Sequence, residues 1–116
     1  MSKDFLAAER EHGAQARILL KDGGAPMKAF RDLVQAAGTD GVLSHKQKEL
    51  MALAIAIAIR CEGCILFHTR SCVKLGVTRP ELLEMIGVAL EMGGGPASVY
   101  GAEALACFDQ MTSGAA

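Results

Sequence analysis

The sequence predicts an all-α protein with a single domain, residues 1–116, of five to six helices arranged around a central helical hairpin. Glycines and prolines divide the chain into segments of helix length, and two capping-box patterns mark helix starts. The alanine-rich segment 50–59 favours helix by propensity. With 116 residues, 51% of them hydrophobic and 22% charged, the chain is long enough to bury a core without cross-links.

The N-terminal third of the chain predicts two helices separated by a glycine pair. A first, charged helix spans residues 4–20 and ends at Gly23 and Gly24. Pro26 then lies in the first turn of a second helix that runs to Gly38, because proline is tolerated at a helix start and glycine commonly follows a helix end. Residues 39–41 form a loop.

The third helix begins at a capping box made by Ser44 and Gln47. Residues 52–59 alternate alanine with a larger apolar residue, which superficially resembles a strand. A half-buried strand alternates apolar with polar residues, whereas every position here is apolar, so helix is favoured. A helix that is apolar all round must be buried all round. In so small a domain, this predicts that a subunit interface covers part of it.

The C-terminal half predicts three more helices, at about 61–75, 78–92 and 97–111. Gly76 ends the first of them, and Thr78 with Glu81 forms the capping box of the second. The segment 93–96, three glycines and a proline, separates the second from the third. Residues 113–116 are expected to be a frayed tail.

Charge and composition exclude several classes of partner. The 12 basic and 13 acidic side chains give a net charge of -1 without a basic stripe, so we expect no nucleic-acid binding. The apolar run 50–59 is about half of the roughly 20 residues that a membrane span needs, so we expect no membrane partner. The N-terminus lacks the apolar core of a signal peptide. We therefore expect a cytoplasmic protein, in which disulfides are usually catalytic or regulatory.

The pattern that carries chemistry is a Cys-x-x-Cys pair, Cys61 and Cys64, with His68 four residues later. If a helix begins near Cys61, then Cys64 and His68 lie one turn apart on one face. The positive end of the helix dipole stabilises a thiolate, and such cysteines have lowered pKa values. A thiolate is the nucleophile in disulfide exchange and in peroxide reduction. The second cysteine is close enough to resolve the intermediate.

Glu49 can join this group only if the chain turns back. On one continuous helix it would lie roughly 18 Å from Cys61 along the axis. A hairpin turn near Ile59–Arg60 instead places Glu49 beside His68, and the break falls just before Cys61, where the next helix should start. A carboxylate beside an imidazole fixes its tautomer and raises its basicity.

These four residues, with eleven, two and three residues between them, resemble the signature of the AhpD-like alkylhydroperoxidases of the carboxymuconolactone decarboxylase superfamily. The resemblance runs from about Ser44 to Ala106. It implies an all-helical fold, a homotrimer or homohexamer, and a redox-active cysteine pair. In that family the positions of Glu49 and His68 form a proton relay, Cys64 faces the peroxide, and Cys61 resolves the intermediate.

The predicted function is therefore that of a thiol-dependent peroxidase or thiol–disulfide oxidoreductase. Its substrate would be a hydroperoxide or a protein disulfide, and a thiol reductant would reset it; no motif implies heme or flavin. The best-known peroxidase of the family has a histidine directly before its second cysteine, where this chain has Gly63. The resemblance consequently supports disulfide exchange more fully than that peroxidase's complete relay.

Three other interpretations stay open. The two cysteines could be buried packing residues. The enzyme could be a lactone decarboxylase in which Glu49 and His68 transfer protons without cysteine redox. A metal-binding oligomeric module could use Cys61, Cys64 and His68, with Cys72 as a fourth ligand on the same face. Cys72 and Cys107 are otherwise expected to be packing residues, and His12 and His45 to be surface residues.

Overall fold

The computed structural model describes residues 3–113, which form five α-helices without a strand. The helices are α1 (Phe5–Asp22), α2 (Gly24–Gly38), α3 (His45–Ile59), α4 (Glu62–Lys74) and α5 (Arg79–Thr112). The predicted all-α class is thus confirmed. Of the expected tail, Ser113 is the C-cap of α5, and residues 114–116 lie outside the described part of the chain.

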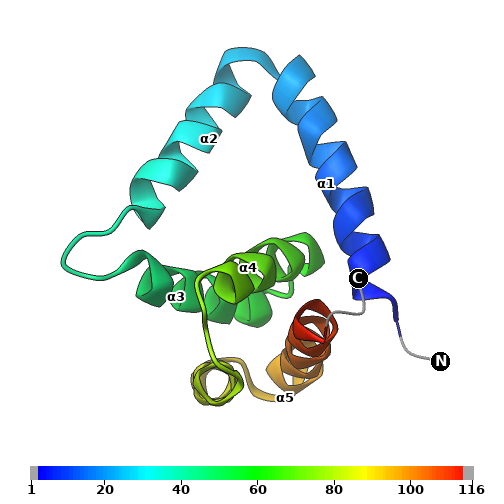
Figure 1. The fold of residues 1–116 in the computed structure, drawn as a ribbon, viewed down its shortest axis with the longest axis vertical. Helices are drawn as coiled ribbons and strands as arrows, with labels where there is room; N and C mark the ends of the chain where they lie inside the picture. Colours follow the sequence, from blue (N-terminus) through cyan, green and yellow to red (C-terminus); the bar gives the residue numbers. More distant parts are fainter. Residues whose placement is uncertain (1–2, 114–116) are drawn as a thin grey trace.

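The core lies where α3, α4 and α5 pack together (Figure 1). Leu53 and Ile57 of α3, Ile65 of α4 and Leu82 of α5 are buried in one cluster. Burying a leucine or isoleucine side chain fully contributes about 1.5–3 kcal/mol relative to leaving it exposed. This shared core fixes the position of α3 against α4, and these two helices carry the predicted site residues.

The turn between α3 and α4 falls where the hairpin prediction placed it. Arg60 is the C-cap of α3 in the left-handed conformation, with φ 60°. The backbone N–H groups of Arg60 and Cys61 donate to the carbonyls of Ile57 and Ala56, respectively. The chain thereby reverses within a few residues, and α4 starts at Glu62 with Cys61 as its N-cap.

Two expected boundaries in the N-terminal third differ from the structure. The first helix continues past the expected end at residue 20 to Asp22, and its N-cap is Asp4, whose carboxylate accepts from the N–H of Ala7 at 3.0 Å. The second helix starts at Gly24, two residues before Pro26. Gly24 has φ 69°, a conformation that glycine adopts without strain, so the chain reverses at this residue and the helix follows immediately.

The predicted break at 93–96 is a kink within α5. Gly94 alone leaves helical geometry, with φ 64° and ψ -146°, and Pro96 follows it inside the helix. A proline ring clashes with the carbonyl four residues before it, so the helix cannot pass straight through this segment. The expected fifth and sixth helices are accordingly the two arms of one kinked helix.

Helices α1 and α2 form an arm that stands away from the core (Figure 1). The base of α1 is anchored by Phe5, which packs with Leu66, Cys107 and Met111. In contrast, every side chain of α2 keeps partial or full exposure, including the large apolar residues Phe30 and Leu33. The arm therefore touches the core near its two ends and is open between them.

Within the single chain α3 is buried only in part, and the expectation that a subunit interface covers the rest stays a prediction. Met51, Ile55 and Ile59 are 45%, 60% and 65% exposed, respectively. They follow one another at four-residue spacing and so form one stripe along the helix. We call these three residues the α3 stripe. None of the helices within residues 3–113 combines the length and apolarity that a membrane span requires.

Candidate active site

The two cysteines of the motif lie at the first turn of α4 and are joined by a disulfide. Their Cα atoms are 5.2 Å apart. Cys61 is the N-cap residue, and its Sγ accepts a hydrogen bond from the backbone N–H of Cys64 at 3.3 Å. Both residues are partly exposed. The pair thus lies at the positive end of the helix, open to a reaction partner.

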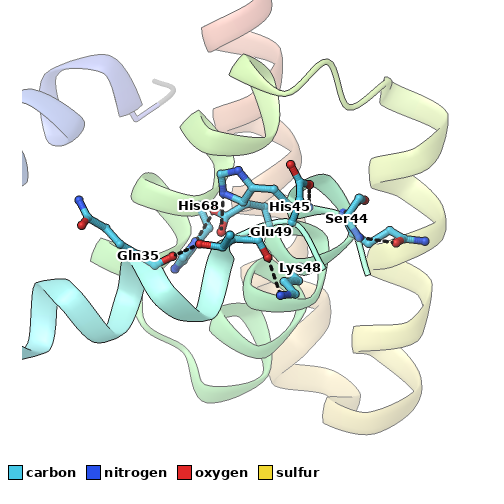
Figure 2. A network of polar contacts seen from close by, with 9 residues as sticks. Gln35, Ser44, His45, Lys48, Glu49 and His68 are labelled. Carbon is cyan, nitrogen blue, oxygen red and sulfur yellow. Dashed lines mark hydrogen bonds and ion pairs between the residues drawn. The ribbon is translucent and has the colours of Figure 1, made fainter. Parts of the chain in front are cut away.

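Glu49 and His68 meet across the hairpin, as the position of the turn predicted. His68 Nδ1 lies 2.8 Å from Glu49 Oε1, and Glu49 is only 8% exposed (Figure 2). A carboxylate can only accept hydrogen bonds, so Nδ1 carries the proton and donates it. This leaves Nε2 as the nitrogen that can exchange a proton with another group. Because a buried carboxylate is costly without hydrogen bonds, the pair is mutually stabilising.

His45 is a second imidazole on the same carboxylate, although the sequence predicted it to be a surface residue. Its Nε2 lies 3.7 Å from Glu49 Oε2 (Figure 2). The ring packs against the end of α2, where a Cβ at Gly38 would meet it at 3.5 Å. The four-residue spacing of His45 and Glu49 at a helix start is a signal that could have predicted this contact.

A small pocket opens beside this carboxylate between α2, α3 and α4. Its volume is about 240 Å³, and its lining combines mostly apolar residues with Lys48 and the Glu49–His68 pair: Leu33, Val34, Ala37, Gly38, Lys48, Glu49, Ala52 and His68. Lys48 Nζ donates to the carbonyl of Thr39 at 2.7 Å and so ties the end of α2 to α3 (Figure 2). The pocket can hold a small, mostly apolar group next to a proton-transferring pair.

His12 is exposed, as expected, and its ring also lies against the segment between the two cysteines. Its Nδ1 would be 3.3 Å from a Cβ at Gly63, and its Nε2 is 3.9 Å from Glu62 Oε2. Lys3 also forms an ion pair with Glu62. Because this contact depends on how α1 packs on α4, local sequence spacing gives no signal for it.

The two remaining cysteines are packing residues, as expected. Cys72 and Cys107 are fully buried free thiols. Burial raises the pKa of Cys72 to about 12, and the nearby charge of Glu49 adds to the effect. Burial raises the pKa of Cys107 to about 11, although the nearby hydroxyl of Thr69 opposes this effect. Both thiols are thus protonated and unreactive at neutral pH.

The metal-site interpretation requires at least three ligand side chains to converge. Within residues 3–113, no group of three His, Cys, Asp or Glu side chains is arranged to hold a metal ion. Cys72, the suggested fourth ligand, is packed in the hydrophobic core with Leu53 and Ile57. The geometry of the described chain therefore gives the metal-binding alternative no support.

Comparison with known proteins identifies the family. The profile of the carboxymuconolactone decarboxylase family matches residues 25–106, which include the whole hairpin and its four site residues. The chain belongs to this family. The resemblance inferred from the spacing of Glu49, Cys61, Cys64 and His68 is confirmed at the level of family and fold.

The matches to similar proteins cover nearly the whole chain. An uncharacterised protein of Cupriavidus necator is 42% identical over 113 residues, which are 97% of this chain and 100% of that protein. A crystallised family member from Legionella pneumophila, in its apo form, is 44% identical, with a TM-score of 0.91 over 96% of this chain and 99% of its own. A Thermotoga maritima member for which an antioxidative role has been suggested is 30% identical, with a TM-score of 0.79 over 96% and 92% of the two chains.

Proposed function

We propose that this family member is a thiol–disulfide oxidoreductase that reduces hydroperoxides or protein disulfides through Cys61 and Cys64. The observation that carries the proposal is the cysteine pair at the N-terminus of α4, one turn before a histidine that a buried carboxylate holds. Helix dipole and imidazole both favour the thiolate that such chemistry needs. The antioxidative role suggested for the Thermotoga maritima relative is in keeping with this activity.

The reaction with a hydroperoxide balances through the two thiols. The thiolate of Cys64 attacks the outer oxygen of the hydroperoxide, the O–O bond breaks, and the alcohol leaves with a proton that His68 supplies. Cys64 is now a sulfenic acid. The thiol of Cys61 attacks its sulfur and releases water, which leaves the Cys61–Cys64 disulfide. A dithiol reductant then restores both thiols by disulfide exchange and leaves as a disulfide itself.

Glu49 and His68 act together as the proton relay of this scheme. Glu49 accepts from Nδ1–H and so keeps the lone pair of the imidazole on Nε2, the nitrogen free to exchange protons. The same contact stabilises the imidazolium when His68 takes the proton of the cysteine thiol. The apolar lining of the adjacent pocket suits the organic part of a hydroperoxide. General acid–base assistance of this kind contributes about 10²–10⁴-fold in rate.

The proposal includes a homotrimer or homohexamer in a cytoplasmic setting. The α3 stripe exposes three large apolar side chains in a row, and α2 exposes further ones. Contiguous apolar surface of this kind typically marks a protein contact. We expect light scattering to give the mass of three or six chains at micromolar concentration. A stable monomer under those conditions would contradict this part.

A second candidate function is proton-transfer chemistry on a lactone, after the name of the family. The observation that favours it is that the pocket is lined by Glu49 and His68 but by neither cysteine. In such an enzyme the relay alone would move protons on the substrate. The two functions are separable with Cys64→Ser, which abolishes disulfide chemistry but leaves the Glu49–His68 pair and any lactone activity in place.

The deciding experiment is mass analysis of the intact, fully reduced protein after mild hydroperoxide treatment. We expect a mass lower by two hydrogen atoms that returns to the starting value with a dithiol reductant. Peptide mapping after alkylation should find Cys61 and Cys64 joined, with the buried Cys72 and Cys107 still reduced. Cys107→Ala should behave like the parent. If Cys61 and Cys64 both stay free in the folded protein, the redox function is wrong.

A further inference from the structure

The residues between the two cysteines are covered by the N-terminal helix. The imidazole of His12 lies so close to Gly63 that a Cβ there would be only 3.3 Å from Nδ1. The other ring nitrogen is 3.9 Å from the Glu62 carboxylate. Because Gly63 has no side chain, the ring of His12 lies directly against the backbone that joins Cys61 to Cys64.

The position of His12 is held by an ion pair between α1 and α4. The guanidinium of Arg70 donates two hydrogen bonds of 2.7 Å to the carboxylate of Glu9. Glu9 lies one turn before His12 on α1, and Arg70 lies two turns after Gly63 on the same face of α4. The hydrogen bond from Arg70 lowers the pKa of Glu9, so the ion pair is complete at neutral pH. The contact of His12 with Gly63 is therefore part of a fixed packing arrangement.

The charges around His12 belong to three parts of the chain. Glu62 of α4 faces it directly, and Lys3, which precedes α1, pairs with the same carboxylate. Lys3 in turn lies 4.0 Å from Glu103 of α5. On α1 itself, the residues four positions before and after His12 are alanines and carry no charge, and Glu9 is engaged by Arg70.

We propose that His12 is a positioning residue that tunes the cysteine pair through its charge. This inference rests on the proposed redox function and adds a residue outside the Glu49–His68 relay. Glu62 lies between the two cysteines in the sequence, and its negative charge opposes the formation of a thiolate at either of them. Protonated His12, together with Lys3, offsets this carboxylate and so stabilises the thiolate. The reduced state of the pair becomes easier to reach, as expected when a cation stabilises the thiolate product of reduction.

The direct test compares the parent with His12→Gln, His12→Lys and Lys21→Gln. In one arm, each protein is equilibrated with a glutathione redox buffer at about pH 6, below the reference pKa of histidine of about 6.5, and the ratio of dithiol to disulfide is measured. In the other arm, thiolate absorbance is followed against pH in the reduced protein. Loss of the charge in His12→Gln should lower the dithiol-to-disulfide ratio about threefold to tenfold. It should also move the thiol titration midpoint to higher pH.

The other variants separate charge from packing. His12→Lys keeps a cation at this position and should match the parent or exceed it in both measurements. Lys21→Gln removes a cation from the last turn of the same helix, about 13 Å from His12 along the axis, and should change neither. Glu62→Gln removes the opposing carboxylate, so both measurements should move in the opposite direction from His12→Gln. Circular dichroism verifies that each variant keeps the helical fold.

The outcomes distinguish this inference from the function on which it rests. If the parent forms no reversible Cys61–Cys64 disulfide, the proposed function itself is wrong. If the parent cycles but His12→Gln keeps its equilibrium and titration, only the role of His12 is overturned. That role is equally overturned if His12→Lys changes both measurements as much as His12→Gln does, because packing and not charge would then be responsible.

Discussion

Glu49 is the residue on which the candidate site depends. It is a carboxylate with 8% exposure that faces His68 at 2.8 Å and His45 at 3.7 Å. A buried carboxylate without such partners would cost several kcal/mol or take up a proton. His68 and His45 therefore share one carboxylate. A change in the charge of either ring changes the electrostatic environment of the other.

The relay predicts an order of effects among its members. His68→Gln should slow the reduction of a hydroperoxide or disulfide by about 10²–10⁴-fold, because the group that moves the proton is lost. Glu49→Gln should slow it less, since an amide oxygen still accepts from Nδ1 and orients the ring. Single-turnover kinetics with a reduced sample measures both. The titration midpoint of the reactive thiol should rise in the same order.

The control for the relay is Cys107→Ala, which changes a buried thiol outside the site and should leave the rate nearly unchanged. If His68→Gln keeps both the rate and the thiol titration of the parent, then no relay exists and His68 is an ordinary packed histidine. If Glu49→Gln is as slow as His68→Gln, the negative charge of Glu49 is essential and orientation alone is insufficient.

The buried thiols predict how stability depends on pH in alkali. Burial raises the pKa of Cys72 from 9.0 to about 12 and that of Cys107 to about 11. Between about pH 9 and 12 the unfolded chain therefore binds fewer protons than the folded one, so the free energy of unfolding falls as pH rises. Below pH 9 the contribution of these thiols is fully present.

Urea denaturation at a series of alkaline pH values measures this decline. The double variant Cys72→Ala and Cys107→Ala has lower stability at every pH because of the lost packing, but its decline with pH should be shallower. An equal slope in parent and variant would contradict the burial argument. Cysteines joined in a disulfide do not titrate, so Cys61 and Cys64 do not contribute to the difference.

The residues that local spacing could predict were those of the hairpin. Cys61, Cys64 and His68 lie within two helical turns, and the turn at Arg60 fixes which residue of α3 meets His68. His45 was within reach of the same reasoning, because it is one turn from Glu49. His12 was not, since its place at Gly63 depends on the Glu9–Arg70 pair, which joins residues 61 positions apart.

At the scale of elements, both the caps and the break in α5 are predictable from local sequence. Ser44 and Thr78 each make the full capping box that their sequences predict, because these hydrogen bonds are local. The glycine-rich segment predicts a break, since glycine and proline both disfavour helix. Within that segment only Gly94 leaves helical geometry, so the break is a sharp kink between the two arms of α5.

Two glycines of α5 predict opposite effects on stability. Gly94 has φ 64° and ψ -146°, which is strained for any residue with a Cβ, so Gly94→Ala should destabilise the fold by about 1–3 kcal/mol. Gly87 is helical and exposed, and a Cβ there meets nothing within 4 Å. Gly87→Ala should thus stabilise the fold by about 0.5–1 kcal/mol. Urea denaturation measures both, and effects of the same sign would contradict the kink geometry.

At the scale of the whole molecule, the chain is more open than its length predicts. Its radius of gyration is 14.3 Å, against about 13 Å for a compact domain of this size. The α1–α2 arm accounts for this, because α2 packs only on α1 and on one end of α3. The pocket beside Glu49 is partly lined by Leu33, Val34 and Ala37 of this arm. Whatever holds the arm in place therefore also shapes the pocket.

The sequence indicated that α3 needs cover on every side but could not say what supplies it. An apolar pattern reports only that a face avoids water, and the covering group can belong to the same chain or to another copy. The side chains of Leu53 and Ile57 are covered by residues of α4 and α5. The α3 stripe is exposed in the single chain, and it is the face that we expect a second copy to bury.

Ile55, at the centre of the α3 stripe, provides the test at this scale. Ile55→Lys places a charge in the middle of the expected contact, and burying an unpaired charge costs more than an interface of this kind can offset. The fold of the single chain should survive, because the side chain is 60% exposed. Light scattering should then report monomers where the parent gives trimers or hexamers. Ile55→Leu is the matched control, since it keeps the apolar volume and should keep the oligomer. If the pocket depends on an arm that partner copies hold in place, Ile55→Lys should also lose hydroperoxide reduction, while oxidised glutathione should still convert its cysteine pair to the Cys61–Cys64 disulfide. An Ile55→Lys protein that stays oligomeric would mean that copies associate through another face.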